Sequence, residues 1–399
     1  MKIKFMIIGL LATAGMLAQE ADTTATEPVD EKGYIFTEVQ TLPHTSVKDQ
    51  NRSGTCWSYS GISFIESESM KLGYDSLNLS EMFIVRHNYA YKAERFVRTH
   101  GKLNFAQGGS FYDVLWAYDT YGILTDDQYN GIAYGEEAPV FGELDAVFDG
   151  YVNGVIKNRN KKLSPVWKQG FNALLDTYFG ELPETVSAAG TEITPKEFAK
   201  LKVGVDADDY VSITSYTHHP FYSSFILEIP DNWQWSSSYN VPLDEMMEIF
   251  HYAIEKGYTI AWGGDVSEKG FSHKNGVAIV PETDVKEMAD SERSKWEDKE
   301  ASDFFTFKEI VPEKNITQEM RQEGFDNWTT TDDHGMHIVG TATDQEGNLY
   351  YYTKNSWNTD NSKYLGYLYM SEAFVKYKTM NIIVNKNAIP KAIRKKLDL

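Results

Sequence analysis

The sequence contains very little cysteine: Cys56 is the one cysteine among 399 residues. A single thiol cannot form an intrachain disulfide, so the fold must be stabilised by its hydrophobic core. Positive charge is also scarce, because 38 lysines and arginines stand against 58 acidic residues and leave a net charge of −20. Nucleic acid and anionic membranes would be repelled by this chain, so we expect neither as a partner.

Long apolar runs are missing outside the first residues. Lys2 and Lys4 precede an apolar run over 5–16, which is too short to span a bilayer with margin, and Ala18 offers a plausible cleavage point. We therefore expect a signal peptide over 1–18 and an exported protein, periplasmic or extracellular. An uncleaved anchor is the alternative. No later stretch is apolar enough to cross a membrane, so we expect no span after signal removal.

Several motifs are absent as well. The sequence has no Walker loop, dinucleotide fingerprint, Gly-x-Ser-x-Gly or His-Glu-x-x-His. His218 and His219 are adjacent and could be metal ligands, but no third and fourth ligands cluster with them. We interpret this pair as structural and expect no metal and no cofactor.

The composition that remains is typical of an ordered globular protein, with 42% hydrophobic and 14% aromatic residues. The pattern changes near residue 209 from helical to β-rich, which predicts an α+β fold. We expect a leader or linker over 19–46, a helical lobe over 47–208, a β-rich lobe over 209–390 and a C-terminal tail over 391–399. The clearest helices are expected at 56–73, 80–98, 111–121 and 242–257, and the clearest strands at 210–215, 258–265, 335–342, 349–357 and 380–384. A charged surface insertion is expected at 281–323.

Cys56 stands where a polar run meets an apolar segment with helical spacing. This pattern predicts a helix that begins at or near Cys56 and ends by Gly73. A thiol in the first helical turn feels the positive end of the helix dipole, which favours the thiolate. Gln50 could swing an amide N–H beside the sulfur and form an oxyanion hole with the Cys56 backbone N–H. A lone cysteine is more often a small buried hydrophobe, but its polar, glycine-containing surroundings here favour a nucleophile.

A thiol nucleophile needs an imidazole and a group that orients it. His337 opens a hydrophobic strand, and Asn355 closes the strand expected to pair with it across a turn at 344–348. The Asn355 oxygen would accept from the His337 imidazole, and Trp357 would shield that hydrogen bond from water. His334 is a rival, three residues earlier. We favour His337 because apolar strand residues flank it.

Taken together, these motifs resemble the active-site signatures of the papain superfamily. The segment 50–60 resembles its nucleophile helix, and 336–340 and 355–357 resemble its second and third signatures. The segment 108–113 and the long separation between cysteine and histidine are most similar to the bleomycin hydrolase/aminopeptidase C branch.

The resemblance implies a papain-like two-lobe fold, with a helical lobe, a β-barrel-like lobe and the site in the cleft between them. It implies a cysteine peptidase, most consistent with an aminopeptidase, that acts on peptide substrates and forms a thioester. The implied roles are nucleophile for Cys56, general base and acid for His337, orienter for Asn355 and oxyanion donor for Gln50. Gly108 and Gly109 would pair with the substrate backbone.

Two implications of the family are open for this chain. Members of the branch carry a long C-terminal arm that restricts cleavage to the substrate N-terminus, whereas this chain stops shortly after Pro390. An endopeptidase is therefore the alternative, followed by a non-catalytic peptide-binding protein and an amidase acting on cell-wall peptides. A homo-oligomer, a hexamer in the family, is the expected assembly.

Overall fold

The computed structural model describes residues 33–188, 190–282, 307 and 309–399. The expected signal peptide lies outside the described residues, as does most of the expected insertion at 281–323. Residues 33–399 form one compact unit. The division into lobes at residue 208 stays a prediction. In the described ranges, no helix combines the length and the apolar character that a bilayer span requires.

Five long helices follow one another in the first half of the chain, and local signals explain where they begin and end. The Ser80 side chain accepts from the Phe83 N–H at the start of the second helix. Ser110 and Asp113 form a capping box at the start of the third, and Gly122, with φ 84°, ends it. These helices are α1 (Cys56–Lys71), α2 (Glu81–Arg98), α3 (Phe111–Tyr121), α4 (Gly142–Ile156) and α5 (Val166–Phe179). The predicted helices at 56–73, 80–98 and 111–121 are thus confirmed.

Short elements connect these helices to the sheet and cover its other side. They are β2 (Val186–Ala188), β3 (Thr191–Ile193), α6 (Pro195–Phe198), η1 (Ala199–Val203), η2 (Ala207–Asp209), α7 (Leu243–Glu255), α8 (Gln318–Asp326), α9 (Glu372–Lys378), η5 (Lys386–Ala388) and α10 (Lys391–Lys396).

The second half of the chain, together with β1 from its beginning, builds one large, mostly antiparallel sheet. Its strands are β1 (Thr37–Thr41), β4 (Tyr210–Thr214), β5 (Ser224–Ile226), β6 (Ser237–Asn240), β7 (Ile260–Gly264), β8 (Phe271–Ser272), β9 (Val277–Ala278), β10 (His334–Thr343), β11 (Leu349–Lys354), β12 (Tyr367–Ser371) and β13 (Thr379–Asn385). They run in the order β5-β6-β4-β13-β7-β10-β11-β12-β9-β8, and β1 pairs with β10. The outermost strands β5 and β8 do not pair with each other among the described residues. The α+β class is confirmed, but the sheet is open and not a closed barrel.

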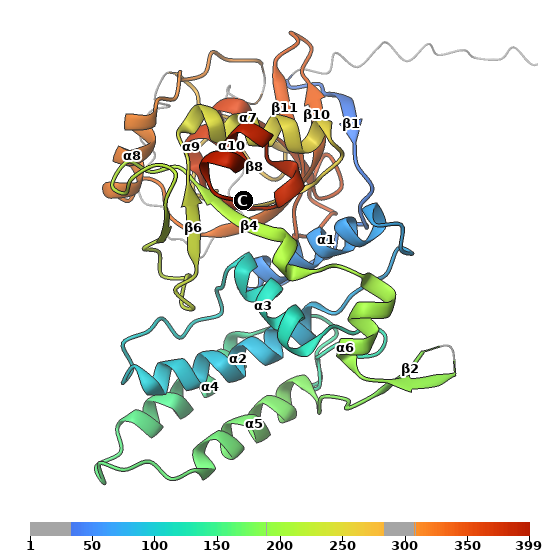
Figure 1. Cartoon of the computed structure of the whole chain (residues 1–399), viewed down its shortest axis with the longest axis vertical. Helices are drawn as coiled ribbons and strands as arrows, with labels where there is room; N and C mark the ends of the chain where they lie inside the picture. Colours follow the sequence, from blue (N-terminus) through green and yellow to red (C-terminus); the bar gives the residue numbers. More distant parts are fainter. Residues whose placement is uncertain (1–32, 189, 283–306, 308) are drawn as a thin grey trace, which may run out of the picture. The chain divides into compact units, whose positions relative to one another are not determined.

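Strand alternation sends the side chains of β7 and β10 to two different cores. Ala261 contributes to the core around α1, whereas Trp262 and Met336 belong to the core beneath α7. Figure 1 shows α1 between the sheet and the helices α2, α4 and α5. The start of α1 and the start of β10 therefore come together at the boundary between helices and sheet, where the site lies.

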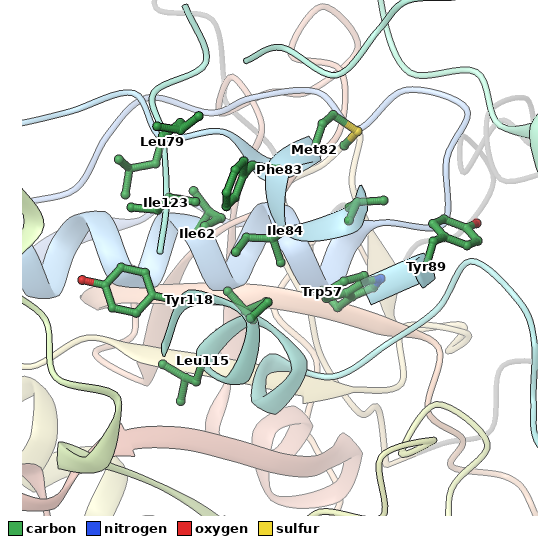
Figure 2. Packing of buried hydrophobic residues seen from close by; sticks show 14 of the residues in the cluster. Trp57, Ile62, Leu79, Met82, Phe83, Ile84, Tyr89, Leu115, Tyr118 and Ile123 are labelled. Atoms are coloured by element: carbon green, nitrogen blue, oxygen red, sulfur yellow. The ribbon is translucent and has the colours of Figure 1, made fainter. Parts of the chain in front are cut away.

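The helical core is rich in large apolar side chains that surround α1. Figure 2 shows Trp57 and Ile62 of α1 together with Phe83 and Ile84 of α2 and Leu115 of α3. Ile62 and Ile84 are fully buried. Because burying each such side chain contributes about 1.5–3 kcal/mol, this packing holds α1 firmly in place.

The C-terminal tail is a helix packed on the sheet. Ile393 of α10 and Leu397, the residue after this helix, are buried in the core beneath α7. Lys396 Nζ lies 2.5 Å from a carboxylate oxygen of Glu245 near the start of α7. The tail therefore ends against α7.

Candidate active site

A network of short hydrogen bonds builds the turn that presents Cys56. Thr55, the fully buried residue before α1, accepts from the Ser58 N–H with its carbonyl at 2.9 Å. The Ser53 hydroxyl lies 2.6 Å from the Thr55 hydroxyl and donates to the Gln50 carbonyl at 2.7 Å. The polar residues that precede the thiol thus fix the first turn of α1, and Cys56 stays partly exposed.

A second loop is hydrogen-bonded along this first turn. Gln107 Oε1 accepts from the Gly54 N–H at 2.7 Å, and the Gln107 carbonyl accepts from the Trp57 indole at 3.0 Å. A Cβ atom on Gly109 would lie 2.9 Å from the Trp57 ring, so only glycine permits this close approach. The loop that contains Gly108 and Gly109 consequently lies beside the nucleophile turn.

Gly108 is enclosed by two charged side chains. Lys92, which is buried, donates from Nζ to the Gly108 carbonyl at 2.5 Å. On the other side, a Cβ on Gly108 would stand 2.0 Å from Asp231 Oδ2, so that carboxylate lies directly against the glycine. Asn104 Nδ2 holds Asp231 by donating to Oδ1 at 3.0 Å. The carboxylate is fixed at the glycine strip that the resemblance assigns to substrate.

The structure pairs Asn355 with His334, the histidine that we disfavoured. His334 Nε2 lies 2.7 Å from Asn355 Oδ1, and Oδ1 also accepts from the Ser356 N–H at 2.8 Å. The Trp357 ring centroid is 4.6 Å from that of His334. The tryptophan therefore covers His334, whereas we expected it to shield His337. The prediction that Asn355 accepts from His337 is therefore wrong.

His337 lies instead beneath the body of α1. Its Nδ1 is 2.8 Å from the Ser63 hydroxyl, which also accepts from Lys354 Nζ at 2.8 Å. Ser63 is two helical turns beyond Cys56, about 10 Å along the axis. Side chains three residues apart on a strand point to opposite faces, which separates His337 from His334. The apolar residues that flank His337, which led us to favour it as the catalytic histidine, instead mark it as a fully buried side chain.

The first turn of α1 lies against the strand that carries His334. A Cβ atom on Gly335, the residue after His334, would lie 3.5 Å from the α-carbon of Trp57, the residue after Cys56. The Ser60 hydroxyl donates to the Gly335 carbonyl at 2.8 Å and ties the start of β10 to α1. The start of α1 and the start of β10 therefore lie together, and His334 at the start of β10 meets Asn355.

Burial sets the charge state of this group. It raises the pKa of the Cys56 thiol to about 12, with the carboxylates of Asp231 and Asp332 adding to the rise. A helix dipole contributes about 0.3–1 kcal/mol, less than one pKa unit, so the expected lowering of the thiol pKa is outweighed. Burial likewise lowers the pKa of His334 to about 4. At neutral pH the resting site therefore holds a thiol and a neutral imidazole.

Gln50 is buried beside the same residues. Its Nε2 donates to the Ser53 carbonyl at 2.6 Å, and its Oε1 accepts from the Ser356 hydroxyl at 2.6 Å. An amide nitrogen carries two hydrogens, so one N–H remains for an oxyanion. The role of Gln50 as oxyanion donor stays a prediction.

A further histidine lies in the site and was missed in the sequence. His273 Nδ1 is 3.3 Å from Asn355 Nδ2, and its Nε2 is 3.0 Å from the Asn358 carbonyl. His273 stands in the turn between β8 and β9, and the parallel pairing of β9 with β12 carries this turn to the site. No local pattern around residue 273 signals such a long-range pairing.

The pair of adjacent histidines has a third partner that we did not expect. Glu228 lies 3.2 Å from His218 Nε2 and 2.9 Å from His219 Nε2. Gln322 Oε1 accepts from the Thr217 N–H at 2.6 Å, which turns the Gln322 amide nitrogen toward His218 Nδ1 at 3.1 Å. His218 Nδ1 then accepts, and its proton sits on Nε2 toward Glu228. The expectation that no third ligand clusters with the two histidines is therefore wrong, because ligand atoms of His218, His219 and Glu228 lie within 4.8 Å of one another.

Fold and site together define a papain-like cysteine peptidase. The profile of the Peptidase C1-like family matches residues 187–399, just over half of the chain, and the chain belongs to that family. Aminopeptidase G of Lactobacillus delbrueckii subsp. lactis is 21% identical over 393 residues, covering 88% of this chain and 83% of that protein. The crystal structure of PepW from Lactobacillus rhamnosis HN001 shares the fold, with a TM-score of 0.68, 16% identity and coverage of 91% of this chain and 84% of that chain. The resemblance to the papain superfamily and its aminopeptidase C-like branch is confirmed.

Proposed function

We propose that the protein hydrolyses peptide bonds with Cys56 as nucleophile, His334 as general base and acid, and Asn355 as the residue that orients His334. The observation that carries this proposal is the 2.7 Å contact between His334 Nε2 and Asn355 Oδ1 at the start of β10, which Ser60 of the Cys56 helix holds through the Gly335 carbonyl. Because Asn355 Oδ1 accepts, the imidazole proton sits on Nε2, and Nδ1 is left to act as the base.

The reaction begins from the neutral pair. His334 takes the thiol proton while the Cys56 sulfur bonds to the substrate carbonyl carbon, and backbone and Gln50 N–H groups stabilise the oxyanion. The imidazolium then protonates the leaving amine, the C–N bond breaks and a thioester remains. Water, deprotonated by His334, attacks the thioester and releases the acid product together with the thiol.

We further propose that the enzyme is an aminopeptidase. The Asp231 carboxylate lies against Gly108, and its charge acts on the Cys56 thiol. A carboxylate there would pair with the free α-ammonium of a bound peptide, and its bulk limits room for residues further toward the N-terminus. The relative named Aminopeptidase G agrees with this specificity.

Mass spectrometry of the products from unblocked and N-acetylated peptides tests the specificity. An aminopeptidase releases single residues from the unblocked peptides and leaves the acetylated ones intact. Internal cleavage of acetylated peptides would favour the endopeptidase instead. Peptide affinity that survives Cys56→Ala, with no hydrolysis by the wild type, would identify a peptide-binding protein.

A further inference from the structure

The amide of Asn355 is held at both ends by histidines. Its Oδ1 meets His334 Nε2 at 2.7 Å, while its Nδ2 meets His273 Nδ1 at 3.3 Å. An amide nitrogen only donates, so His273 Nδ1 must be an unprotonated acceptor. The proton of His273 then sits on Nε2, which lies 3.0 Å from the Asn358 carbonyl, a group that only accepts. Both contacts therefore agree with a single neutral tautomer of His273.

We propose that His273 is a positioning residue that keeps the Asn355 amide oriented toward His334, and that protonation of His273 reverses this orientation. The inference rests on the proposed function. A protonated His273 has no lone pair on Nδ1 and repels the Asn355 N–H. Rotation of the amide would present its oxygen to His273 and its nitrogen to His334.

The rotated amide disables the base. An N–H facing His334 Nε2 requires an unprotonated Nε2, which moves the imidazole proton to Nδ1. His334 could then no longer take the thiol proton of Cys56. Since general acid–base catalysis contributes about 10²–10⁴-fold, loss of the positioning partner should cost about 10–100-fold.

The surroundings of His273 determine when it becomes protonated. The Asp49 carboxylate and the Asn358 carbonyl favour the charged ring, and His334 lies on the far side of Asn355. The Trp357 ring, with its centroid 5.2 Å away, covers His273. Burial dominates and lowers the pKa of His273 below its ordinary value. Protonation of His273 is therefore expected only under acidic conditions.

Two variants of His273 separate positioning from packing. His273→Ala removes the acceptor, whereas His273→Asn supplies a carbonyl oxygen that accepts but cannot be protonated. We expect H273A to lower kcat about 10–100-fold with KM within about twofold, and H273N to recover most of kcat. We also expect the acid limb of the kcat/KM profile of H273N to move to lower pH. His100→Asn, at an exposed position with φ 57°, is the matched control and should behave as the wild type.

The alkylation rate of Cys56 by iodoacetamide, measured against pH, gives a readout that does not need peptide hydrolysis. If the wild type hydrolyses no peptide, the proposed function fails, but a slower alkylation in H273A that H273N restores still supports the positioning role. If H273A keeps the wild-type kcat, acid limb and alkylation profile, the inference is overturned. Thermal unfolding of each variant identifies a folding defect, and H273N, which keeps a polar acceptor at this position, separates such a defect from the loss of positioning.

Discussion

At the scale of single residues, the site depends on the face of β10 to which a side chain points. His334 and His337 are three positions apart, so one meets Asn355 and the other meets Ser63 under α1. Cys56, Gln50 and Asn355 stand out in the sequence because their polar surroundings interrupt apolar patterns. The structure joins Gln50 to Asn355 through Ser356, and the catalytic roles of the three residues stay predictions. The choice between His334 and His337 could not be predicted, because apolar neighbours mark a buried position and do not show which histidine lies near the thiol.

Alanine substitution of each histidine distinguishes them. His334→Ala should reduce kcat/KM by about 10²–10⁴-fold because the base is lost. His337→Ala should keep kcat/KM within about tenfold but lower the free energy of unfolding by about 1–3 kcal/mol, since the Ser63 hydroxyl loses a buried partner. Steady-state kinetics and urea unfolding measure both effects. A larger kinetic loss in H337A would restore our first assignment.

Asp231 should govern the preference for a free amine. Asp231→Asn keeps the hydrogen bond with Asn104 in reach and removes the charge, so KM for unblocked peptides should rise about tenfold while kcat changes little. The ratio of kcat/KM for unblocked and N-acetylated peptides measures this. An unchanged ratio in D231N would remove the carboxylate from the specificity argument.

At the scale of elements, α1 and α3 are close because α1 has a glycine where they cross. A Cβ on Gly61 would lie 2.7 Å from Val114 Cγ2, so Gly61→Ala should lower the free energy of unfolding by about 1–3 kcal/mol despite the better helix propensity of alanine. Gly150 in α4 has open space around its α-carbon. Gly150→Ala is therefore the control and should stabilise by about 0.5–1 kcal/mol. Urea unfolding of both variants is the test, and a stabilised G61A would contradict the packing described.

A buried carboxyl links the strand β12 to the residues after β9. Glu313 accepts from the Val280 N–H at 2.7 Å and from the Ser371 hydroxyl at 2.6 Å, and burial raises its pKa to about 7. Between its ordinary pKa of about 4.5 and 7, the folded state holds this proton and the unfolded state does not. Stability from this group is therefore present at low pH and lost as pH rises through that window. The free energy of unfolding of the wild type should fall between pH 5 and pH 7.5. In Glu313→Gln this fall should be smaller by about 1–2 kcal/mol. An equal decline in E313Q would contradict the raised pKa.

Elements differ in how well a sequence reveals them. The Ser80 and Ser110 caps and Gly122 mark helix ends locally, and the hairpin of β10 and β11 follows from its turn. The sheet order does not follow from local patterns, because β13 inserts between β4 and β7, and β9 pairs with β12. Such pairings join segments that are distant in sequence, and His273 was missed for this reason.

At the scale of the whole molecule, the tail and the specificity are separable. Ile393 and Leu397 are buried beneath α7, so deletion of residues 391–399 should lower the free energy of unfolding by about 3 kcal/mol or more. The preference for unblocked peptides should remain, because Asp231 is far along the chain from the tail and is held by Asn104. Product analysis of the truncated protein checks this. Cleavage of acetylated peptides after truncation would assign the selectivity to the tail.

We also propose that the protein is exported after loss of residues 1–18. Mass spectrometry of protein recovered from the cell envelope or medium should give a mature N-terminus at Gln19. Retention of Lys2 and the apolar run would instead favour the uncleaved anchor. Light scattering of the same material tests the homo-oligomer that the family resemblance implies.

Because Cys56 is the one cysteine of the sequence, its reaction with a thiol reagent can be followed on the intact protein. A cysteine-specific reagent can mark only Cys56, because the sequence has no other cysteine. The fraction of molecules that carry one mass increment of such a reagent therefore measures how many Cys56 thiols have reacted. The same singularity leaves an oxidised sulfur without an internal resolving thiol, so recovery from oxidation depends on an external reductant.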